Sequence, residues 1–540
     1  MNAEDSAQTP SVVVRGGTVF DGLGSSGVRA DVLVAGGRVR EIGRIDVPVA
    51  ARVIDVDGCF VAPGFIDPHA HSDVAPMLEK GHPFKLGQGV TTEINGNCGM
   101  SVAPATPRSV PLLLERSSAE LLRGIDLHES SFAEFLERVE RARPVTHVAY
   151  LVGHGTLRLA ANGPDAALSP GSMARMRTLA ADAFEAGAIG FSTGLIYAPG
   201  SYADRDELVE LAHVAARYNA LYATHMRDEG AAVIASIEEA AAIAEAGGVR
   251  LQISHCKLAG SSNHGRAKEL LGAIRRVAER GVDVRGDQYP YTAGSTGITA
   301  LLPTRALDGG QEHLLGILQD PEQRLALRLE AERGAVGAGL WSACEPAGVF
   351  ITGHADDAVV GRTLVEIVSV TDEDPFDAAC RLILRDPGSS IAIEVMSEDD
   401  VREIMADPLV GVGSDNSLPP TAGSSGLPHP RTFGTFPRLL GRYVREEGVL
   451  DWPEAIRKST SLIARHFGLT DRGTLTPGSV ADIVVFDPES VGHPGDFTRP
   501  DLPVSGIEHV LLEGVPVLTD SDYSGARRGR VLRRRGDRVE

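Results

Sequence analysis

The chain of 540 residues has few cysteines, no long apolar run and no excess of positive charge. Its five cysteines form no spaced framework, which argues against a disulfide scaffold and leaves single thiols free for other tasks. No run of about 18 apolar residues occurs, so no segment has the length of a membrane-spanning helix. The first ten residues are polar and acidic, without the apolar stretch of a secretion signal. We therefore expect a cytoplasmic protein.

The formal net charge of -21 argues against nucleic acid or an anionic membrane as a partner, because both require a basic surface. A length of 540 residues with 43% hydrophobic composition is enough to bury a large core. We expect one large catalytic domain, a smaller second domain and a small-molecule partner. An acidic protein still allows one or two buried arginines to hold an anionic substrate.

Short β-type runs separated by turn glycines open the chain and return near its end. The first set is SVVVRGGTVF, DVLVAGGRVREIG and ARVIDVDGCFVAPGF, and the second is VADIVVFDP, HVLLEGVPVLTD and GRVLRR. Such runs are typical of small β-sandwich modules. We predict that residues 1–62 and 474–540 together form one β-sandwich domain.

Residues 63–473 repeat a pattern of helix, glycine and strand. Two of the repeated units are GSMARMRTLAADAFEAGAIGFSTGL and VIASIEEAAAIAEAGGVRLQISHCK. This repetition indicates parallel strands joined by crossover helices, and it predicts an α/β fold closed into a (β/α)8 TIM-like barrel. The segment from about 299 to 348 is helical and charged without a buried strand. We expect this segment to be an insertion and a candidate lid over the site.

Polar side chains that suit a metal follow several of the expected strands, where barrel enzymes keep their catalytic groups. The run APGFIDPHAHSD delivers His69 and His71 on one face of an extended strand. Cys98 follows a second strand, and His225 and His255 end two later ones. One thiolate and two neutral imidazoles give Zn²⁺ three ligands and leave a fourth position for water. We therefore predict a catalytic zinc site at Cys98, His225 and His255.

Asp415 follows the last expected strand, PLVGVGSDN. A carboxylate in that position is costly to bury unless a metal or hydrogen bonds compensate it. A helix cap or a turn is the alternative role for this aspartate. We interpret Asp415 as the general base and acid beside the metal.

The order, spacing and strand context of these motifs resemble the N-acyl-D-amino-acid deacylase (D-aminoacylase) family of the amidohydrolase superfamily. The resemblance covers nearly the whole chain through GFIDPHAHSD, EINGNCG, GHGTLR, GFSTGL, THMRDEG, ISHCK, DQYPYTAGST, GVGSDN, HPRTFG and SVADIVVFDP. It implies zinc-dependent hydrolysis of the amide bond of N-acyl-D-amino acids, or of a related N-acylated carboxylate. It also implies a tight zinc site at Cys98, His225 and His255, a weaker second metal position near His69 and His71, and Asp415 as the catalytic carboxylate.

The family pattern further implies that Arg431, Tyr289 and Lys257 hold the substrate carboxylate. A guanidinium suits this task because its planar fork can make two parallel hydrogen bonds. The fourth strand, AIGFSTGL, lacks the lysine that many other amidohydrolases carbamylate, which weighs against hydantoinase or dihydroorotase activity. Two features depart from the family. Asn416 stands where glycine is typical, and the loop SLPPTAGSSGLPHPR before Arg431 is longer.

Two other functions compete with this interpretation. Residues 190–194 fit the G-x-S-x-G pattern of serine hydrolases, with Ser192 as nucleophile, but that pattern requires a helix directly after it. The loop LIYAPGSY follows instead. The second alternative is a deacylase that acts on a non-amino-acid amide of secondary metabolism.

Overall fold

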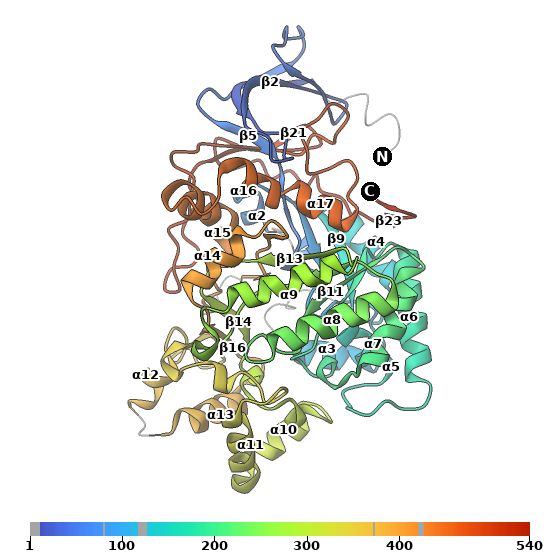
Figure 1. The fold of residues 1–540 in the computed structure, drawn as a ribbon, viewed down its shortest axis with the longest axis vertical. Coiled ribbons are helices and arrows are strands. Elements are labelled where there is room, and N and C mark those ends of the chain that lie inside the picture. Colours follow the sequence, from blue (N-terminus) through green and yellow to red (C-terminus); the bar gives the residue numbers. More distant parts are fainter. Residues whose placement is uncertain (1–10, 79–81, 117–126, 371–372, 420–425) are drawn as a thin grey trace.

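The computed structural model describes residues 11–78, 82–116, 127–370, 373–419 and 426–540, so the first ten residues of the predicted β-sandwich domain lie outside it. Its centre is a parallel sheet of eight strands in the order β17-β13-β12-β11-β10-β9-β8-β6 (Figure 1). This sheet confirms the predicted barrel. The strands are β6 (Phe65–Asp67), β8 (Val90–Asn95), β9 (His147–Gly153), β10 (Gly190–Gly194), β11 (Leu221–His225), β12 (Leu251–Ile253), β13 (Val284–Gln288) and β17 (Val410–Val412).

The first and last barrel strands meet just beyond their carboxyl ends. There β18 (Asn416–Ser417) runs parallel to β7 (Ala70–His71). The backbone amide of Asp415 donates to the carbonyl of His69 at 2.8 Å. Backbone hydrogen bonds therefore hold together two site segments that lie far apart in the sequence.

Helices cover the outside of the barrel (Figure 1). In α9, the buried Leu270, Ile274 and Val277 recur at spacings of three and four, which gives the helix one apolar face toward the sheet. Helix α6 stops at Gly187, whose φ of 116° suits glycine, and the chain turns there into β10. The helices are α4 (Phe132–Ala142), α5 (His154–Ala161), α6 (Ser172–Ala186), α7 (Arg205–Ala216), α8 (Val233–Gly247), α9 (Ala267–Glu279), α14 (Glu398–Ala406), α16 (Trp452–Lys458) and α17 (Ser461–Phe467), with α2 (Phe84–Gly87), α3 (Ser109–Arg116) and α15 (Arg431–Arg438) in the connections.

Both ends of the chain join in one mixed sheet of nine strands, at the top of Figure 1. The two halves meet where β19 pairs antiparallel with β5, with Val485 opposite Val61. The predicted β domain built from both termini is therefore present. Its strands are β1 (Val12–Val19), β2 (Val28–Ala35), β3 (Arg38–Gly43), β4 (Arg52–Asp55), β5 (Phe60–Pro63), β19 (Ile483–Phe486), β20 (Ile507–Leu512), β21 (Val515–Thr519) and β22 (Asp522–Tyr523).

The end of the chain departs from the sequence expectation. The segment GRVLRR lies outside the nine-stranded sheet, and β23 (Arg534–Arg535) with β24 (Arg538–Val539) forms a separate ribbon. Val531 bridges to Val148 of β9, and Leu532 is buried with apolar residues of the barrel. The tail lies against the barrel because its apolar side chains are buried there.

The chain leaves the barrel between β13 and β17. A small antiparallel sheet forms in this interval from β14 (Ala293–Gly297), β15 (Val349–Gly353) and β16 (Ser390–Glu394). Four helices accompany it, namely α10 (Gln311–Gln319), α11 (Pro321–Arg333), α12 (Leu364–Val368) and α13 (Pro375–Arg385). Helices α10 and α11 lie within residues 299–348, where the sequence predicts a helical insertion, but the segment between β13 and β17 extends well beyond these bounds. The three strands give no clear signal in the sequence because they are short, and β14 has the composition of a loop, AGSTG.

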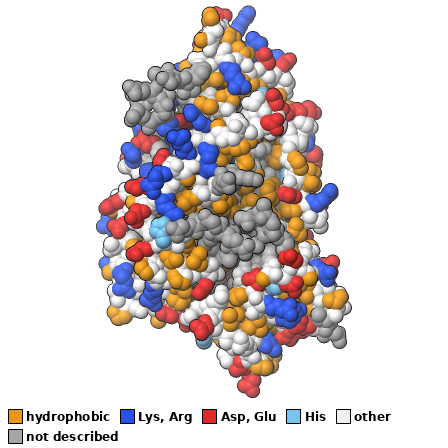
Figure 2. Space-filling model, turned by 180° about the vertical axis from the view of Figure 1, so that it is seen from behind, with side chains coloured by type: hydrophobic (Ala, Val, Ile, Leu, Met, Phe, Trp, Pro, Cys, Tyr) orange, Lys and Arg blue, Asp and Glu red, His pale blue; other side chains and the backbone are white. Residues whose placement is uncertain are grey.

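The surface mixes charges of both signs. The face in Figure 2 carries acidic and basic side chains side by side with apolar ones between them. Neighbouring helices share exposed ion pairs such as Arg177 with Glu210, at 2.9 Å. In the described part of the chain, no helix combines the length and the apolar character needed to cross a membrane.

Candidate active site

The residues of the predicted zinc site lie together at the carboxyl ends of the barrel strands. Cys98 follows β8, His225 is the last residue of β11, and His255 follows β12. Their ligand atoms lie within 4.8 Å of one another, and Cys98 Sγ is 3.5 Å from His255 Nε2. The geometry brings these three side chains into one cluster, and zinc binding by them stays a prediction.

A second cluster shares Cys98 and adds His69, His71 and Asp415, again within 4.8 Å. Cys98 Sγ lies 3.3 Å from His69 Nε2. Asp415 Oδ1 lies 3.3 Å from His69 Nε2 and 3.2 Å from His71 Nε2. The two clusters therefore meet at one thiol.

Three of these residues adopt a left-handed backbone conformation that side chains rarely take. The φ angles are 52° at Cys98, 35° at His255 and 49° at Asp415. Such a conformation costs on the order of 1–3 kcal/mol for a non-glycine residue and persists only where the surroundings hold it. Strain of this kind is concentrated at functional sites. Its presence at three candidate residues supports the location of the site.

Two buried acidic groups of the cluster, the Cys98 thiol and the Asp415 carboxyl, lie beside imidazole rings. Burial alone would raise the pKa of the Cys98 thiol, but the charges of His69 and His255 hold that pKa well below its usual value. The thiolate is the form that binds metals. Burial would also raise the pKa of the Asp415 carboxyl, but Arg431 and His69 keep that pKa well below its usual range. The surroundings therefore favour the anionic form of both groups.

The surroundings of His225 indicate whether the cluster can bind a metal. Both ring nitrogens of His225 are buried without a hydrogen bond, since Glu229 Oε2 comes no closer than 3.5 Å to Nε2, although buried polar atoms normally have a partner. Burial lowers the pKa of this imidazole, which favours the neutral ring that metal binding requires. Together with the Cys98 thiolate and His255, the ring supplies the nitrogen and sulfur ligands that Zn²⁺ prefers. The donor set fits zinc.

Two acidic residues that the sequence analysis missed contact the histidines. Glu229 Oε1 lies 2.9 Å from His255 Nδ1, and Glu229 Oε2 lies 3.5 Å from His225 Nε2. Asp287 Oδ1 lies 3.2 Å from His69 Nδ1 and accepts the backbone N–H of His255 at 2.7 Å. Carboxylates in such positions fix the orientation of metal-binding rings. The signal for Asp287 was present in the sequence, because this carboxylate lies in a strand that the barrel must bury.

The residues assigned to the substrate carboxylate share one wall of the site. The Arg431 guanidinium lies 4.6 Å from the centre of the Tyr289 ring, and the Lys257 ammonium lies 5.8 Å from the same centre. Arg431 Nη1 is 2.9 Å from Asp415 Oδ2, while its Nε is buried without a hydrogen-bond partner. Lys257 donates to Glu229 at 2.6 Å and lies 2.7 Å from His255 Nδ1. Arg431 therefore has a donor left for an anion, whereas Lys257 already has an acidic partner.

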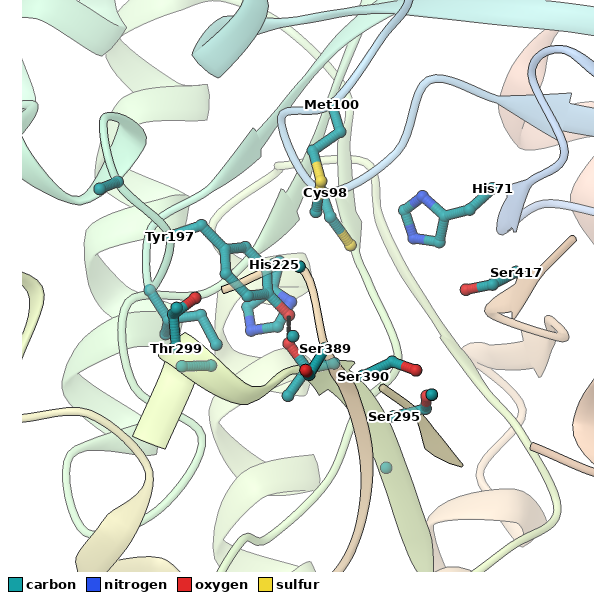
Figure 3. A pocket seen from close by; sticks show the side chains of 18 of the residues that line it. His71, Cys98, Met100, Tyr197, His225, Ser295, Thr299, Ser389, Ser390 and Ser417 are labelled. Carbon is teal, nitrogen blue, oxygen red and sulfur yellow. Dashed lines mark hydrogen bonds between the residues drawn. The ribbon is translucent and has the colours of Figure 1, made fainter. Parts of the chain in front are cut away.

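The site opens into a cavity of about 680 Å³. In Figure 3 the Cys98 sulfur and the rings of His71 and His225 border one side of it, and Ser295 and Ser390 from the inserted sheet lie across from Cys98. Apolar side chains line a further part, including those of Leu112, Leu113, Leu159, Leu302, Leu307 and Leu314. The inserted segment thus forms a wall of the cavity, so it can contribute to substrate selection.

Ser192 does not have the surroundings of a serine nucleophile. It lies inside β10, where its hydroxyl donates to the Gly96 carbonyl at 2.5 Å and accepts from the Gly99 amide at 3.0 Å. A catalytic serine needs a base within hydrogen-bond reach. Because both hydrogen bonds go to backbone groups, the structure argues against the serine-hydrolase alternative.

Asn416, where the resemblance leads us to expect glycine, is a buried hydrogen-bonding residue. Its Oδ1 accepts from Ser414 at 2.9 Å, and its Nδ2 donates to the Ser72 hydroxyl at 3.3 Å. Asn416 therefore ties the end of the last strand to the segment that follows His71. Part of the long loop before Arg431, residues 420–425, lies outside the described residues.

Comparisons with known proteins establish the family. A model described as "Amidohydrolase family" matches residues 52–265 and 376–518. The chain is 40% identical to N-acyl-D-glutamate deacylase of Alcaligenes xylosoxydans xylosoxydans over 97% of this chain and 96% of the relative. It is 35% identical to D-aminoacylase of the same organism over 98% and 99%.

A solved structure agrees with these relatives. The N-acyl-D-glutamate deacylase from Bordetella bronchiseptica, complexed with zinc and a phosphonate inhibitor, is 34% identical to this chain. It matches the fold with a TM-score of 0.80 over 97% of this chain and 100% of that chain. These matches confirm the resemblance found in the motifs: the chain belongs to the amidohydrolase family and, within it, to the N-acyl-D-amino-acid deacylases.

Proposed function

We propose that this chain hydrolyses the amide bond of N-acyl-D-amino acids in a zinc-dependent reaction that releases a carboxylic acid and a D-amino acid. The observation that carries the proposal is the meeting of Cys98, His225, His255 and Asp415 beside the buried Arg431 in one cavity. This arrangement supports metal-assisted hydrolysis of a substrate that carries a carboxylate. Residues 63–473 would form the catalytic barrel, and residues 1–62 with 474–540 the β domain.

Cys98, His225 and His255 would hold the tight zinc, and His69 and His71 would contribute to a weaker second position. When bound, zinc polarises an amide carbonyl and lowers the pKa of a water molecule. Glu229 and Asp287 hold the imidazole rings of His255 and His69 in one orientation. Such support commonly accounts for about 10- to 100-fold in metal affinity or activity.

Asp415 would move the proton. Its carboxylate is ionised and lies beside the histidines, so it can accept a proton from the water whose oxygen attacks the amide carbon. The same proton then passes to the amide nitrogen, and the carbon–nitrogen bond breaks with a neutral amine as leaving group. A water oxygen thus ends in the new carboxylic acid, and the nitrogen leaves with one proton more.

Arg431 would bind the α-carboxylate of the substrate. Its side chain is only 2% exposed, and the Tyr289 ring packs against it, so the guanidinium plane is fixed before substrate arrives. A guanidinium that is already fixed loses little conformational freedom on binding. Lys257 adds positive charge to this wall, although its ammonium is held mainly by Glu229.

The proposal is tested by zinc analysis together with a substrate panel. We expect about one tightly held zinc per chain, loss of activity on chelation and recovery when zinc is returned. N-acetyl-D-amino acids should be cleaved faster than their L-isomers, and the leucine, glutamate and aspartate derivatives would show which of the deacylases this chain follows. Metal-free protein with full activity would contradict the proposal. Cleavage of neutral amides alone would favour the secondary-metabolite alternative.

A further inference from the structure

The G-x-S-x-G motif of β10 has no task in the chemistry proposed above. Ser192 is fully buried, and its hydroxyl uses both its donor and an acceptor site on backbone groups. These two groups belong to the first and last residues of the turn 96–99 that carries Cys98. The serine therefore spans the turn from one end to the other.

The turn 96–99 cannot hold its shape by backbone preference alone. Gly96 and Gly99 have φ angles of 78° and 71°, and Cys98 between them has 52°. Glycine takes such angles freely, but cysteine does so only under constraint. The Met100 N–H donates to the Asn97 carbonyl within this region at 2.9 Å, and contacts from outside the turn add to this bond in keeping the Cys98 side chain in one direction.

The neighbouring strands approach this turn at backbone contact. A Cβ atom on Gly194 of the motif would lie 2.1 Å from the Cys98 carbonyl oxygen, and one on Gly153 of β9 would lie 2.6 Å from the Gly99 carbonyl carbon. Side chains at either position would push the turn away. Two residues of the motif thus contact the turn 96–99. Gly194 packs closely against its backbone, and Ser192 forms hydrogen bonds with it.

We propose that Ser192 is a positioning residue that locks the turn 96–99 and thereby aims the Cys98 thiol at His69 and His255. Sγ lies 3.3 Å from His69 Nε2 and 3.5 Å from His255 Nε2 in this conformation. The proposal rests on the proposed function, because it takes Cys98 as a metal ligand. Ser192 itself touches neither metal nor substrate.

Loss of the hydroxyl has a specific consequence. It leaves the Gly96 carbonyl and the Gly99 amide buried without partners, so the turn has reason to shift toward water or toward another hydrogen bond. A shift of the turn moves the thiol away from the histidines. Changes in groups that orient ligands typically weaken metal binding by about 10- to 100-fold.

The test uses the full-length protein loaded with Zn²⁺ or Co²⁺ and four variants. Ser192→Ala and Ser192→Val remove the hydroxyl. Ser192→Thr keeps the hydroxyl on a side chain that has the same size and shape as valine. Ser459→Ala is the matched control, because Ser459 is equally buried and donates to the Ala455 carbonyl at 2.9 Å far along the chain from the turn. Zinc affinity is measured by chelator competition, and the thiolate-to-cobalt absorption band reports the Cys98 bond directly.

We expect Ser192→Ala and Ser192→Val to lose about 10- to 100-fold in zinc affinity and to weaken the cobalt band. Ser192→Thr and Ser459→Ala should stay close to the unmodified protein in both measurements. The proposal is overturned if Ser192→Ala and Ser192→Val keep normal affinity and band, or if Ser192→Thr loses as much as Ser192→Val. A Ser192→Ala chain that fails to fold even with zinc would also overturn it, because the hydroxyl would then serve the barrel as a whole. Absence of the band in the unmodified protein would instead contradict the assignment of Cys98 to the metal.

Discussion

Asp415 faces two kinds of partner through its two oxygens. Oδ1 lies beside the rings of His69 and His71, and Oδ2 lies beside the Arg431 guanidinium. Removing one partner of a buried ion pair strongly destabilises the fold, because the other charge stays buried without compensation. The charges of Asp415 and Arg431 therefore stabilise one another in the site. The same carboxylate therefore serves the proton transfer and the electrostatic balance of the site.

Replacing Asp415 by asparagine separates these tasks, because the amide keeps the size of the side chain but cannot carry a proton. We expect Asp415→Asn to lower kcat by at least about 10²-fold, the lower end of what general acid–base catalysis contributes. Bound zinc should change little, whereas a change in KM would report the ion pair that Arg431 loses. Elemental analysis and steady-state kinetics on one preparation check this. Loss of zinc together with activity would make Asp415 mainly a ligand.

Arg431→Lys tests the substrate carboxylate. A lysine ammonium is a point charge and cannot replace the planar fork of a guanidinium, so we expect KM for N-acyl-D-amino acids to rise by about tenfold or more. The measurement compares each acid with its primary amide, which lacks the carboxylate. The variant and the unmodified protein should treat the amide alike. An unchanged KM for the acid would mean that its carboxylate binds elsewhere.

Helices α5 and α7 are joined by a buried carboxylate. Glu207, in the first turn of α7, lies 2.7 Å from His154 Nε2 and accepts from Arg158 Nε at 2.9 Å. Burial alone would raise the pKa of Glu207, but the hydrogen bond from His154 and the charge of Arg158 lower it to about 2. These helices follow β9 and β10, the strands whose Gly153 and Gly194 pack against the backbone of the turn 96–99. Their connection therefore supports the site from outside the barrel.

The lowered pKa of Glu207 predicts an acid-dependent contribution to stability. A pKa below its unfolded value of 4.5 means that the carboxylate stabilises the fold fully above that pH, and that the stabilisation is lost as the pH falls toward 2. The shift corresponds to on the order of 3 kcal/mol. Urea unfolding of Glu207→Gln should show a loss of this size at pH 7 and a smaller difference near pH 3.

The control for this variant is Glu210→Gln on the same helix, because the Glu210 ion pair with Arg177 is exposed. Exposed pairs contribute about 0–1 kcal/mol, so this change should have little effect. Parallel stability curves for Glu207→Gln and the unmodified protein across this pH range would argue against the network.

A buried aspartate forms one of the connections between the β domain and the barrel. Asp482, just before β19, forms an ion pair with Arg472 and lies 3.3 Å from His147 Nε2 at the start of β9. It also accepts the backbone N–H of Glu513 at 2.9 Å. Burial would raise the pKa of this carboxyl, but Arg472 and His147 hold the pKa below its usual range. The C-terminal half of the β domain is thus tied to the barrel by the charge of Asp482.

Asp482→Asn removes the main partner of the buried Arg472 charge and leaves it only the longer contact of Nη2 with Glu513 Oε1, at 3.4 Å. We expect a loss of about 3–5 kcal/mol in the free energy of unfolding, the usual cost of breaking a buried ion pair from one side. Asp471→Asn is the control, because its pair with Arg38 is partly exposed and should contribute about 1 kcal/mol or less. Calorimetry measures the loss of stability in each of the two variants. A variant with unchanged stability would show that the connection lies elsewhere.

The sequence by itself determined the barrel, the β domain and the identity of the candidate ligands. Each ligand follows its own apolar strand, and the carboxyl ends of parallel strands meet at one edge of a sheet. Local patterns were therefore sufficient to select Cys98, His225 and His255. The assignment of zinc to them rests on their chemistry and stays a prediction.

Tertiary structure alone decided how these residues are supported. The contact of Asp287 with His69 joins residues 218 positions apart, and β14 of the insertion pairs with β16, Ala293 opposite Glu394. The partner of Lys257 and the support of the Cys98 turn by Ser192 also depend on which strands become neighbours. Periodicity reports which face of an element is buried, but it carries no information about which distant group lies opposite. That choice arises only when the barrel closes and the strand ends are packed against one another.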